Sequence, residues 1–84
     1  MAKIIVYSAD YCPYCDTAKQ LLTQKGAAFT EIRVDLDPAQ KEKMMTLSGR
    51  RTVPQIFIND QHIGGCDDLM ALNAAGKLDP LLRS

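Results

Sequence analysis

Short apolar runs alternate along the chain with longer stretches in which apolar residues recur at helical spacing. Residues 3–7 (Lys-Ile-Ile-Val-Tyr) and residues 55–58 (Gln-Ile-Phe-Ile) are rich in β-branched and aromatic side chains, which is typical of buried strands. Residues 29–34 alternate between two faces and predict another strand. The Asn-Asp pair at 59–60 is a turn signal, and the residues after it, 62–63, predict a short fourth strand.

The first helix is predicted to start just after the first strand. Pro13 suits the first helical turn, because its missing N–H would have no partner there. Ala18, Leu21 and Leu22 then recur at helical spacing. Gly26 is predicted to end this helix.

A second helix is predicted to begin at Asp37 and Pro38. Asp37 can accept hydrogen bonds from the first N–H groups, and Pro38 takes the first helical position. Gln40 stands three residues after the cap, the spacing of a capping box. Met44 and Leu47 are predicted to form the apolar face of this helix, and Gly49 is predicted to end it.

The third helix is predicted to open at Asp67 and Asp68, because acidic residues are favoured at helix starts. It carries Leu69 and Leu72 on one face, and Gly76 closes it.

The resulting order β-α-β-α-β-β-α predicts an α/β fold. A strand–helix–strand unit implies a parallel strand pair, whereas the tight turn at 59–60 implies an antiparallel hairpin. A four-stranded mixed sheet with helices on both faces satisfies both requirements, and this is the thioredoxin-like architecture. Residues 78–82 are expected to form a short terminal turn that packs against it.

Length and charge narrow the possible functions. The 84 residues are enough for one domain, which we expect to span residues 1–84. Ten basic residues offset ten acidic residues, and this neutrality argues against nucleic acid as a partner. No apolar run approaches the roughly 20 residues that span a bilayer, so we expect no membrane partner. The first strand starts too early for a signal peptide, and we expect a cytoplasmic monomer.

Three cysteines make an odd set, and two of them form the motif Cys12-Pro13-Tyr14-Cys15. A secreted disulfide scaffold would have an even and denser set, so the motif points to catalysis or to metal binding. Zinc would need four ligands, and Cys66 and His62 are the only spare soft ones. We therefore predict no metal site. A third alternative, two incidental core cysteines, does not explain why the motif lies between a strand and a helix.

The position of Cys12 at the start of a helix has a chemical consequence. The thiolate is the nucleophile, and a free cysteine with a pKa of about 8.5 is mostly protonated at neutral pH. Lowering that pKa by about 3 units requires about 4 kcal/mol, whereas the helix dipole supplies at most about 2 kcal/mol. Hydrogen bonds must supply the remainder, and we expect them from the N–H groups of Tyr14 and Cys15 and from the Cys15 thiol. Asp10 and Asp16 would oppose the shift if they lie close.

Cys12 is therefore predicted to attack disulfides. Glutathione can resolve the adduct, or Cys15 can attack Cys12 and close the Cys12–Cys15 disulfide. Cys15, one turn into the helix, is expected to be more buried and to act as the resolving thiol.

Three motifs in order resemble the glutaredoxin family, specifically its small bacterial dithiol type. They are Cys12-Pro13-Tyr14-Cys15, Thr52-Val53-Pro54 and Gly64-Gly65-Cys66-Asp67-Asp68, and the resemblance covers residues 4–82. It implies glutathione as co-substrate and no tightly bound cofactor. It also implies protein partners with disulfides or glutathione adducts, ribonucleotide reductase among the candidates.

The resemblance also implies a role for each matched residue. Pro54 would be a cis-proline facing the dithiol, and Val53 would pair its backbone with the cysteine of glutathione. The N–H groups of Cys66 and Asp67 would bind the γ-glutamyl carboxylate, and the Asp67 side chain would bind the amino group. Plain helix capping is the alternative for Asp67 and Asp68. The glutathione-binding residues that it implies are Cys12, Tyr14, Arg51, Thr52, Val53, Pro54, Cys66 and Asp67.

The chain departs from the family pattern at Ala9, where many members have a lysine that helps to bind glutathione. Arg51 is placed to meet the glycine carboxylate, and Arg50 is a weaker candidate. Cys66 is expected to be a small buried hydrophobic residue. The alternative function is a glutathione-assisted iron–sulfur cluster carrier. Pro13 and Cys15 argue against it, because cluster-binding members usually carry Cys-Gly-Phe-Ser or a motif without proline after the first cysteine.

Overall fold

Within residues 2–84, which the computed structural model describes, the chain forms four strands and four helices. The observed order contains the predicted β-α-β-α-β-β-α and adds one helix at the end. The elements are β1 (Ile4–Ser8), α1 (Pro13–Gln24), β2 (Thr30–Arg33), α2 (Pro38–Ser48), β3 (Gln55–Ile58), β4 (Gln61–Gly64), α3 (Cys66–Ala74) and α4 (Leu78–Arg83).

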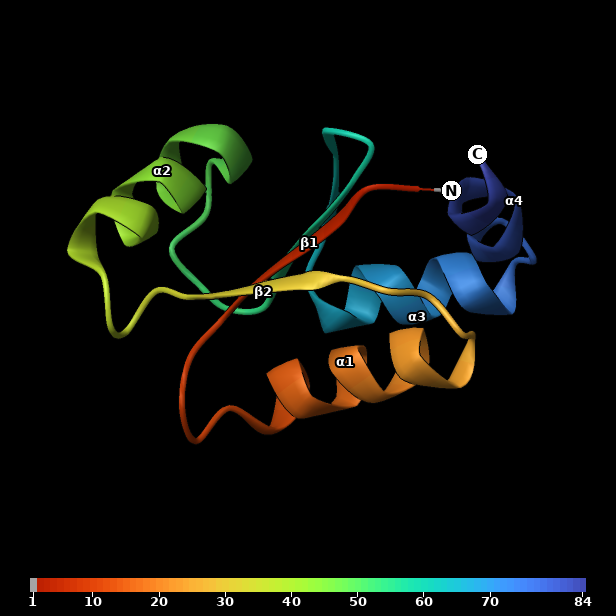
Figure 1. Cartoon of the computed structure of the whole chain (residues 1–84), viewed down its shortest axis with the longest axis horizontal. Coiled ribbons are helices and arrows are strands. Elements are labelled where there is room, and N and C mark those ends of the chain that lie inside the picture. The colour runs from red at the N-terminus through yellow and green to blue at the C-terminus, as the bar shows by residue number, and fades with distance from the viewer. Residues whose placement is uncertain (1) are drawn as a thin grey trace.

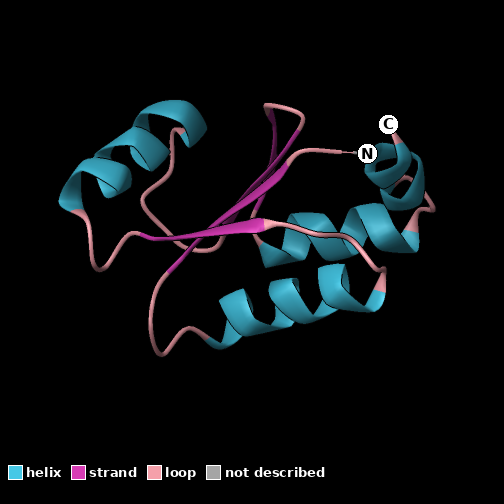
Figure 2. Ribbon diagram, in the orientation of Figure 1, coloured by secondary structure: helices cyan, strands magenta, loops and turns pink. Residues whose placement is uncertain are grey.

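The strands, magenta in Figure 2, form one mixed sheet. Their order in the sheet is β2-β1-β3-β4. β1 pairs with β2 in parallel, with Ile5 opposite Thr30. It pairs with β3 in the antiparallel sense, and β3 and β4 form the predicted antiparallel hairpin. The α/β class and the four-stranded mixed sheet are therefore confirmed.

Helices cover both faces of this sheet. Figure 1 shows α1 and α3 together on one side and α2 on the other. Successive side chains of a strand point to opposite faces. Val6 and Ile56 accordingly lie in the core cluster with residues of α1, α3 and α4, whereas Tyr7 and Phe57 pack with Met44 of α2.

Helix α2 differs from its prediction in two details. The capping box is wrong: the carboxylate of Asp37 accepts the Ala39 N–H at 3.1 Å, but the amide oxygen of Gln40 is buried and has no hydrogen-bond partner among the described residues. The apolar face is also partly wrong, because Leu47 is 53% exposed. The helix contacts the sheet through Met44 and its neighbour Met45, so its buried stripe is too narrow to include the next turn.

The end of the chain is more regular than predicted. Residues 78–83 form helix α4, and Leu78 at its first position is fully buried. Leu81 and Leu82 pack against the same core cluster as α1 and α3. The terminal segment therefore forms part of the core.

Candidate functional site

The two cysteines of the motif lie at the start of α1, after the loop that follows β1. Cys12 has an extended backbone (φ −115°, ψ 96°) and is the N-cap of α1, with Pro13 at the first helical position, as predicted. The Cys15 N–H donates to the Cys12 Sγ at 3.2 Å. The two cysteines form a disulfide with a Cα–Cα separation of 5.2 Å. This structure is therefore the oxidised form of the motif.

The two sulfurs differ in access. Cys12 is half-buried, whereas Cys15 has no exposed surface. A disulfide substrate can thus reach Cys12 and not Cys15, which agrees with the predicted burial of Cys15. Of the three predicted donors, the Cys15 N–H makes its bond. Among the described residues the Tyr14 N–H makes none to this sulfur, and the Cys15 thiol is taken up in the disulfide.

The loop before β3 faces the sulfur of Cys12. The Val53–Pro54 peptide bond is cis, as the resemblance implies. The carbonyl oxygen of Val53 lies 3.8 Å from the Cys12 Sγ. Pro54 is buried, while Thr52 is exposed. The loop therefore brings an open stretch of backbone next to the accessible sulfur.

A groove of about 310 Å³ extends from this loop to the start of α3. It gathers residues from three distant parts of the chain: α1, the segment before β3, and the junction of β4 with α3. Besides Cys12, the resemblance predicts seven glutathione-binding residues, and six of them line this groove: Tyr14, Thr52, Val53, Pro54, Cys66 and Asp67. The other four lining residues are Arg50, Gln55, Gly65 and Asp68.

Arg51 does not line this groove. It borders a neighbouring pocket of about 350 Å³ together with Ala9, Lys41 and Val53. Because Val53 lines both hollows, the two are adjacent. Arg50, the weaker candidate of the sequence, is the arginine in the groove itself. Lys41 was missed, because it lies on α2, far along the chain from each of the three motifs.

The start of α3 is held by Asp68. Its carboxylate accepts the Gly65 N–H at 2.9 Å and pairs with the Arg50 guanidinium at 3.0 Å. The bond from Gly65 and the contact with Arg50 hold the pKa of this carboxyl below its usual value. Gly64 has a φ of 122°, and a side chain there would collide with the Asp68 carboxylate. The capping role thus belongs to Asp68.

Asp67 is left exposed at the mouth of the groove. The first N–H groups of a helix have no partner within the helix, so those of Cys66 and Asp67 are available to an anion. Cys66 itself is 7% exposed and belongs to the main core cluster. Burial, and then the charge of Asp67, raise the pKa of its thiol. Cys66 is therefore a neutral, buried thiol, as the sequence predicts.

One buried polar residue of the groove wall was not singled out from the sequence. Gln55 has no exposed surface, and its side chain bonds to Thr52 and to His62. The available signal was a glutamine heading a strand whose other residues, 56–58, are all apolar. A polar side chain that is buried in this way requires hydrogen-bond partners nearby.

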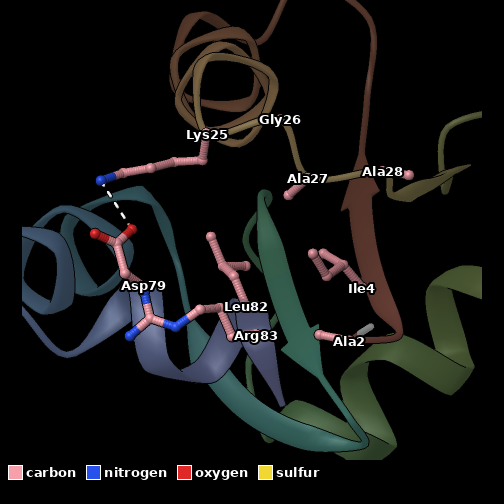
Figure 3. Close-up of a pocket in the computed structure, with 9 residues that line it drawn as sticks. All are labelled: Ala2, Ile4, Lys25, Gly26, Ala27, Ala28, Asp79, Leu82 and Arg83. Atoms are coloured by element: carbon pink, nitrogen blue, oxygen red, sulfur yellow. Dashed lines mark ion pairs between the residues drawn. The ribbon is translucent and has the colours of Figure 1, made fainter.

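A second hollow, of about 330 Å³, lies at the other ends of β1 and α1 (Figure 3). Lys25 and Asp79 form an ion pair of 2.9 Å at its rim. Its walls carry small apolar side chains such as Ala27 and the larger Leu82, and it contains no thiol. The disulfide chemistry therefore belongs to the groove beside Cys12.

Neither a metal cluster nor a membrane span is seen in residues 2–84. No three histidine, cysteine, aspartate or glutamate side chains of this range are grouped so that they could hold an ion. No helix in the same range has the length and apolar character needed to cross a bilayer.

Comparison with known proteins agrees with this geometry. The glutaredoxin family model matches residues 4–63. Glutaredoxin 3 of Escherichia coli (strain K12) is 57% identical over 83 residues, which cover 99% of this chain and 100% of that protein. A probable glutaredoxin of Synechocystis sp. is 54% identical over 84 residues, which cover 99% of this chain and 96% of that protein.

Solved structures show the same fold. A buckwheat glutaredoxin–glutathione complex superimposes with a TM-score of 0.90 at 39% identity, covering 98% of this chain and 77% of that one. A glutaredoxin from Brucella melitensis gives 0.86 at 52% identity, covering 98% and 89%. The chain therefore belongs to the glutaredoxin family of glutathione-dependent thiol–disulfide oxidoreductases.

Proposed function

We propose that Cys12 is the attacking thiol of this oxidoreductase and Cys15 its resolving thiol, within a single domain spanning residues 1–84. The observation that carries the proposal is the placement of the Cys12 sulfur. Cys12 is half-buried, and its sulfur accepts an N–H at the start of α1. The sulfur also lies 3.8 Å from the carbonyl oxygen of Val53, which lines the groove. A helix start stabilises an anion, so the reduced sulfur is held as the reactive thiolate.

Reduction of a glutathione mixed disulfide needs Cys12 alone. Its thiolate attacks the glutathione sulfur, the disulfide bond breaks, and the electron pair leaves on the protein substrate's sulfur, which takes a proton from water. Cys12 is then bonded to glutathione. A second glutathione thiolate attacks that adduct, releases the Cys12 thiolate and forms glutathione disulfide. The second glutathione sulfur is thereby oxidised as the protein sulfur is reduced to a thiol, while the first glutathione sulfur passes from the mixed disulfide into glutathione disulfide.

Reduction of a protein disulfide uses both cysteines. Cys12 forms a mixed disulfide with the substrate, and the thiolate of Cys15 then attacks Cys12. This step releases the second substrate thiol and closes the Cys12–Cys15 disulfide that the structure contains. Two molecules of glutathione return the pair to the dithiol.

The groove suits the two ends of the glutathione molecule differently. The cysteine of the tripeptide would lie along the backbone of Val53, beside Cys12. The γ-glutamyl carboxylate would meet the N–H groups of Cys66 and Asp67 at the start of α3, and its ammonium would meet the exposed Asp67 carboxylate. Tyr14 and Thr52 would form the walls. The likeness to a glutathione complex of buckwheat glutaredoxin supports glutathione as the ligand.

The glycine carboxylate would point into the adjacent pocket. Arg51 and Lys41 both border that pocket beside Ala9. Two cations thus lie close to the place where many relatives have a lysine and this chain has an alanine. We assign the glycine carboxylate to Arg51, with Lys41 as an additional positive charge.

The physiological partners would be glutathione and proteins with disulfides or glutathione adducts, ribonucleotide reductase among them. A reducing cytoplasm is the compartment that fits. Cys66 remains a free thiol, and free thiols and reducible dithiols persist where glutathione keeps them reduced.

The test is a glutathione-coupled assay with two substrates, a glutathione mixed disulfide and a protein disulfide. Cys12→Ser is expected to abolish turnover of both, because the remaining thiol of the motif, Cys15, has no exposed surface from which to attack a substrate. Cys15→Ser is expected to keep turnover of the mixed disulfide and to lose reduction of the protein disulfide. Equal loss of both activities in the two variants would contradict the assigned roles.

A further inference from the structure

We propose that Gln55 and His62 are positioning residues that fix the loop at residues 52–54 for glutathione. The inference builds on the proposed function, since it assigns the support of the same groove. Thr52 and Val53 line that groove, and the Val53 carbonyl faces the Cys12 sulfur at 3.8 Å. Behind them, a chain of hydrogen bonds runs from Thr52 through Gln55 to His62.

The burial of Gln55 shows that its bonds matter. Its side chain is fully buried, and a buried amide without partners is unfavourable. Its Nε2 donates to the Thr52 carbonyl at 3.0 Å and lies 3.3 Å from the Thr52 hydroxyl. Its Oε1 lies 2.7 Å from the His62 Nε2. Both ends of the amide are therefore engaged, one with the loop and one with β4.

The direction of these bonds follows from chemistry. A carbonyl oxygen can only accept, so the Thr52 carbonyl must face the NH₂ group of Gln55. The amide oxygen then faces His62, and it too can only accept. His62 must therefore carry its proton on Nε2 and donate it to Gln55. If His62 lost this proton in favour of Nδ1, the amide oxygen would lose its partner.

The surroundings of His62 favour a neutral imidazole ring. The ring stacks at 5.0 Å from the Phe57 ring in a tilted arrangement. Burial lowers the pKa of His62, the charge of Arg50 lowers it further, and Asp68 acts in the opposite sense. The ring is therefore neutral near pH 7, with one N–H to place. Gln55 fixes where that proton resides.

The consequence is a loop anchored from behind rather than from the groove. Thr52 and Val53 are free to present their outer polar groups to a ligand because an inner bond holds their backbone. Loss of the anchor would let the loop adopt other positions, and glutathione binding would then have to order it again. The chemistry at Cys12 depends on α1, so saturating glutathione should largely restore the rate.

The first variant is Gln55→Met, which keeps the shape of the side chain and removes the amide. We expect the KM for glutathione to rise about tenfold, the equivalent of the bonds lost, with kcat changed less than about twofold. Leu82→Ala is the control, because Leu82 is half-buried and lines the hollow at the other ends of β1 and α1 instead of the groove. It should lower the melting temperature and leave the KM unchanged.

Two His62 variants keep the test valid if Gln55→Met fails to fold. His62→Phe preserves an aromatic ring beside Phe57 but has no donor, and the KM for glutathione should rise severalfold. His62→Gln supplies an amide donor and should restore most of the affinity. Equal KM values for the wild type and His62→Phe, or a fall in kcat alone, would overturn the proposal.

Nitrogen-15 NMR of the wild-type ring gives an independent readout. The proposal requires the proton on Nε2 at neutral pH, and a proton on Nδ1 would refute it. The wild type and Cys12→Ser are assayed alongside the variants. Turnover that survives in Cys12→Ser would overturn the function assigned to Cys12, whereas turnover that depends on Cys12 but has an unaltered KM in Gln55→Met would overturn only the positioning role.

Discussion

The starts of α1 and α2 are built in the same way and do different things. In both helices a proline occupies the first helical position and the residue before it has an extended backbone. Asp37 accepts the Ala39 N–H at 3.1 Å at the start of α2. Cys12 accepts the Cys15 N–H at 3.2 Å at the start of α1. A carboxylate caps one helix, and a sulfur caps the other.

The difference lies in what the capping atom can become. The carboxylate of Asp37 cannot attack a disulfide or form one, so its hydrogen bond contributes only to stability. The sulfur of Cys12 can be a thiolate, a mixed disulfide or the Cys12–Cys15 disulfide, and the helix start favours the thiolate among these. The same local structure is thus a cap at one place and an activating environment at the other, where a groove adjoins it.

The largest effect is expected when the capping sulfur of α1 is replaced by a carboxylate like the one that caps α2. Cys12→Asp places a carboxylate at the start of α1 and is expected to lower turnover by at least about a thousandfold, since the motif keeps no accessible thiolate. Its free energy of unfolding should nevertheless exceed that of Cys12→Ala by about 1 kcal/mol, because the carboxylate caps the helix. Urea denaturation of the two variants under reducing conditions measures this. Equal stabilities would show that the site at Cys12 does not act as a cap.

The second prediction concerns the start of α2. Asp37→Ala should lower the free energy of unfolding by about 1 kcal/mol and leave turnover unchanged, because Asp37 lies outside the groove. Asp37→Asn keeps an oxygen acceptor and should lose only a few tenths of a kcal/mol. A loss of turnover in Asp37→Ala at full stability would argue against a purely structural cap.

A smaller effect is expected from adding a charge near the start of α1. Ala9→Lys adds a cation beside Arg51 and Lys41, and the KM for glutathione should fall about two- to threefold, as for an exposed ion pair. Ala9→Met, which is of similar length but uncharged, is the control. The gain should fade at high salt. A gain that persists at 1 M salt, where the Debye length is about 3 Å, would point to packing instead.

The smallest effect concerns the start of α3 and depends on pH. The folded-state pKa of Asp68 lies below its ordinary value. The contribution of Asp68 to the free energy of unfolding is therefore complete above its unfolded-state pKa of about 3.9. It is lost as the pH falls through the lower folded-state pKa. The stability difference between the wild type and Asp68→Asn should be constant above pH 5 and shrink in acid. A difference that grows in acid would contradict this sign.

The elements of the fold were predictable because their signals are local. The prolines and caps before α1 and α2, and Gly49 with a φ of 71° after α2, act within a few residues. The same holds for the alternation in the strands. The short helix α4 was underestimated, because its stability comes from burying Leu78 in the core rather than from a capping signal.

The sequence predicts the site only where a motif is present. Cys12 and Cys15 follow from a Cys-x-x-Cys motif between a strand and a helix, and the family resemblance adds the cis bond at Pro54. Which arginine borders the groove depends on the direction in which each side chain leaves the loop, and this requires the tertiary structure. The contact of Gln55 with His62 joins two strands across a hairpin, and neither residue alone carries a sequence signal for it.

The most direct test of the account is the ionisation of Cys12. Reduced protein is alkylated with iodoacetamide over a range of pH, and mass spectrometry identifies the modified residue and its rate. The account predicts that Cys12 reacts first and that its pKa lies well below the value of about 8.5 for a free thiol. A Cys12 that ionises like a free cysteine would contradict it.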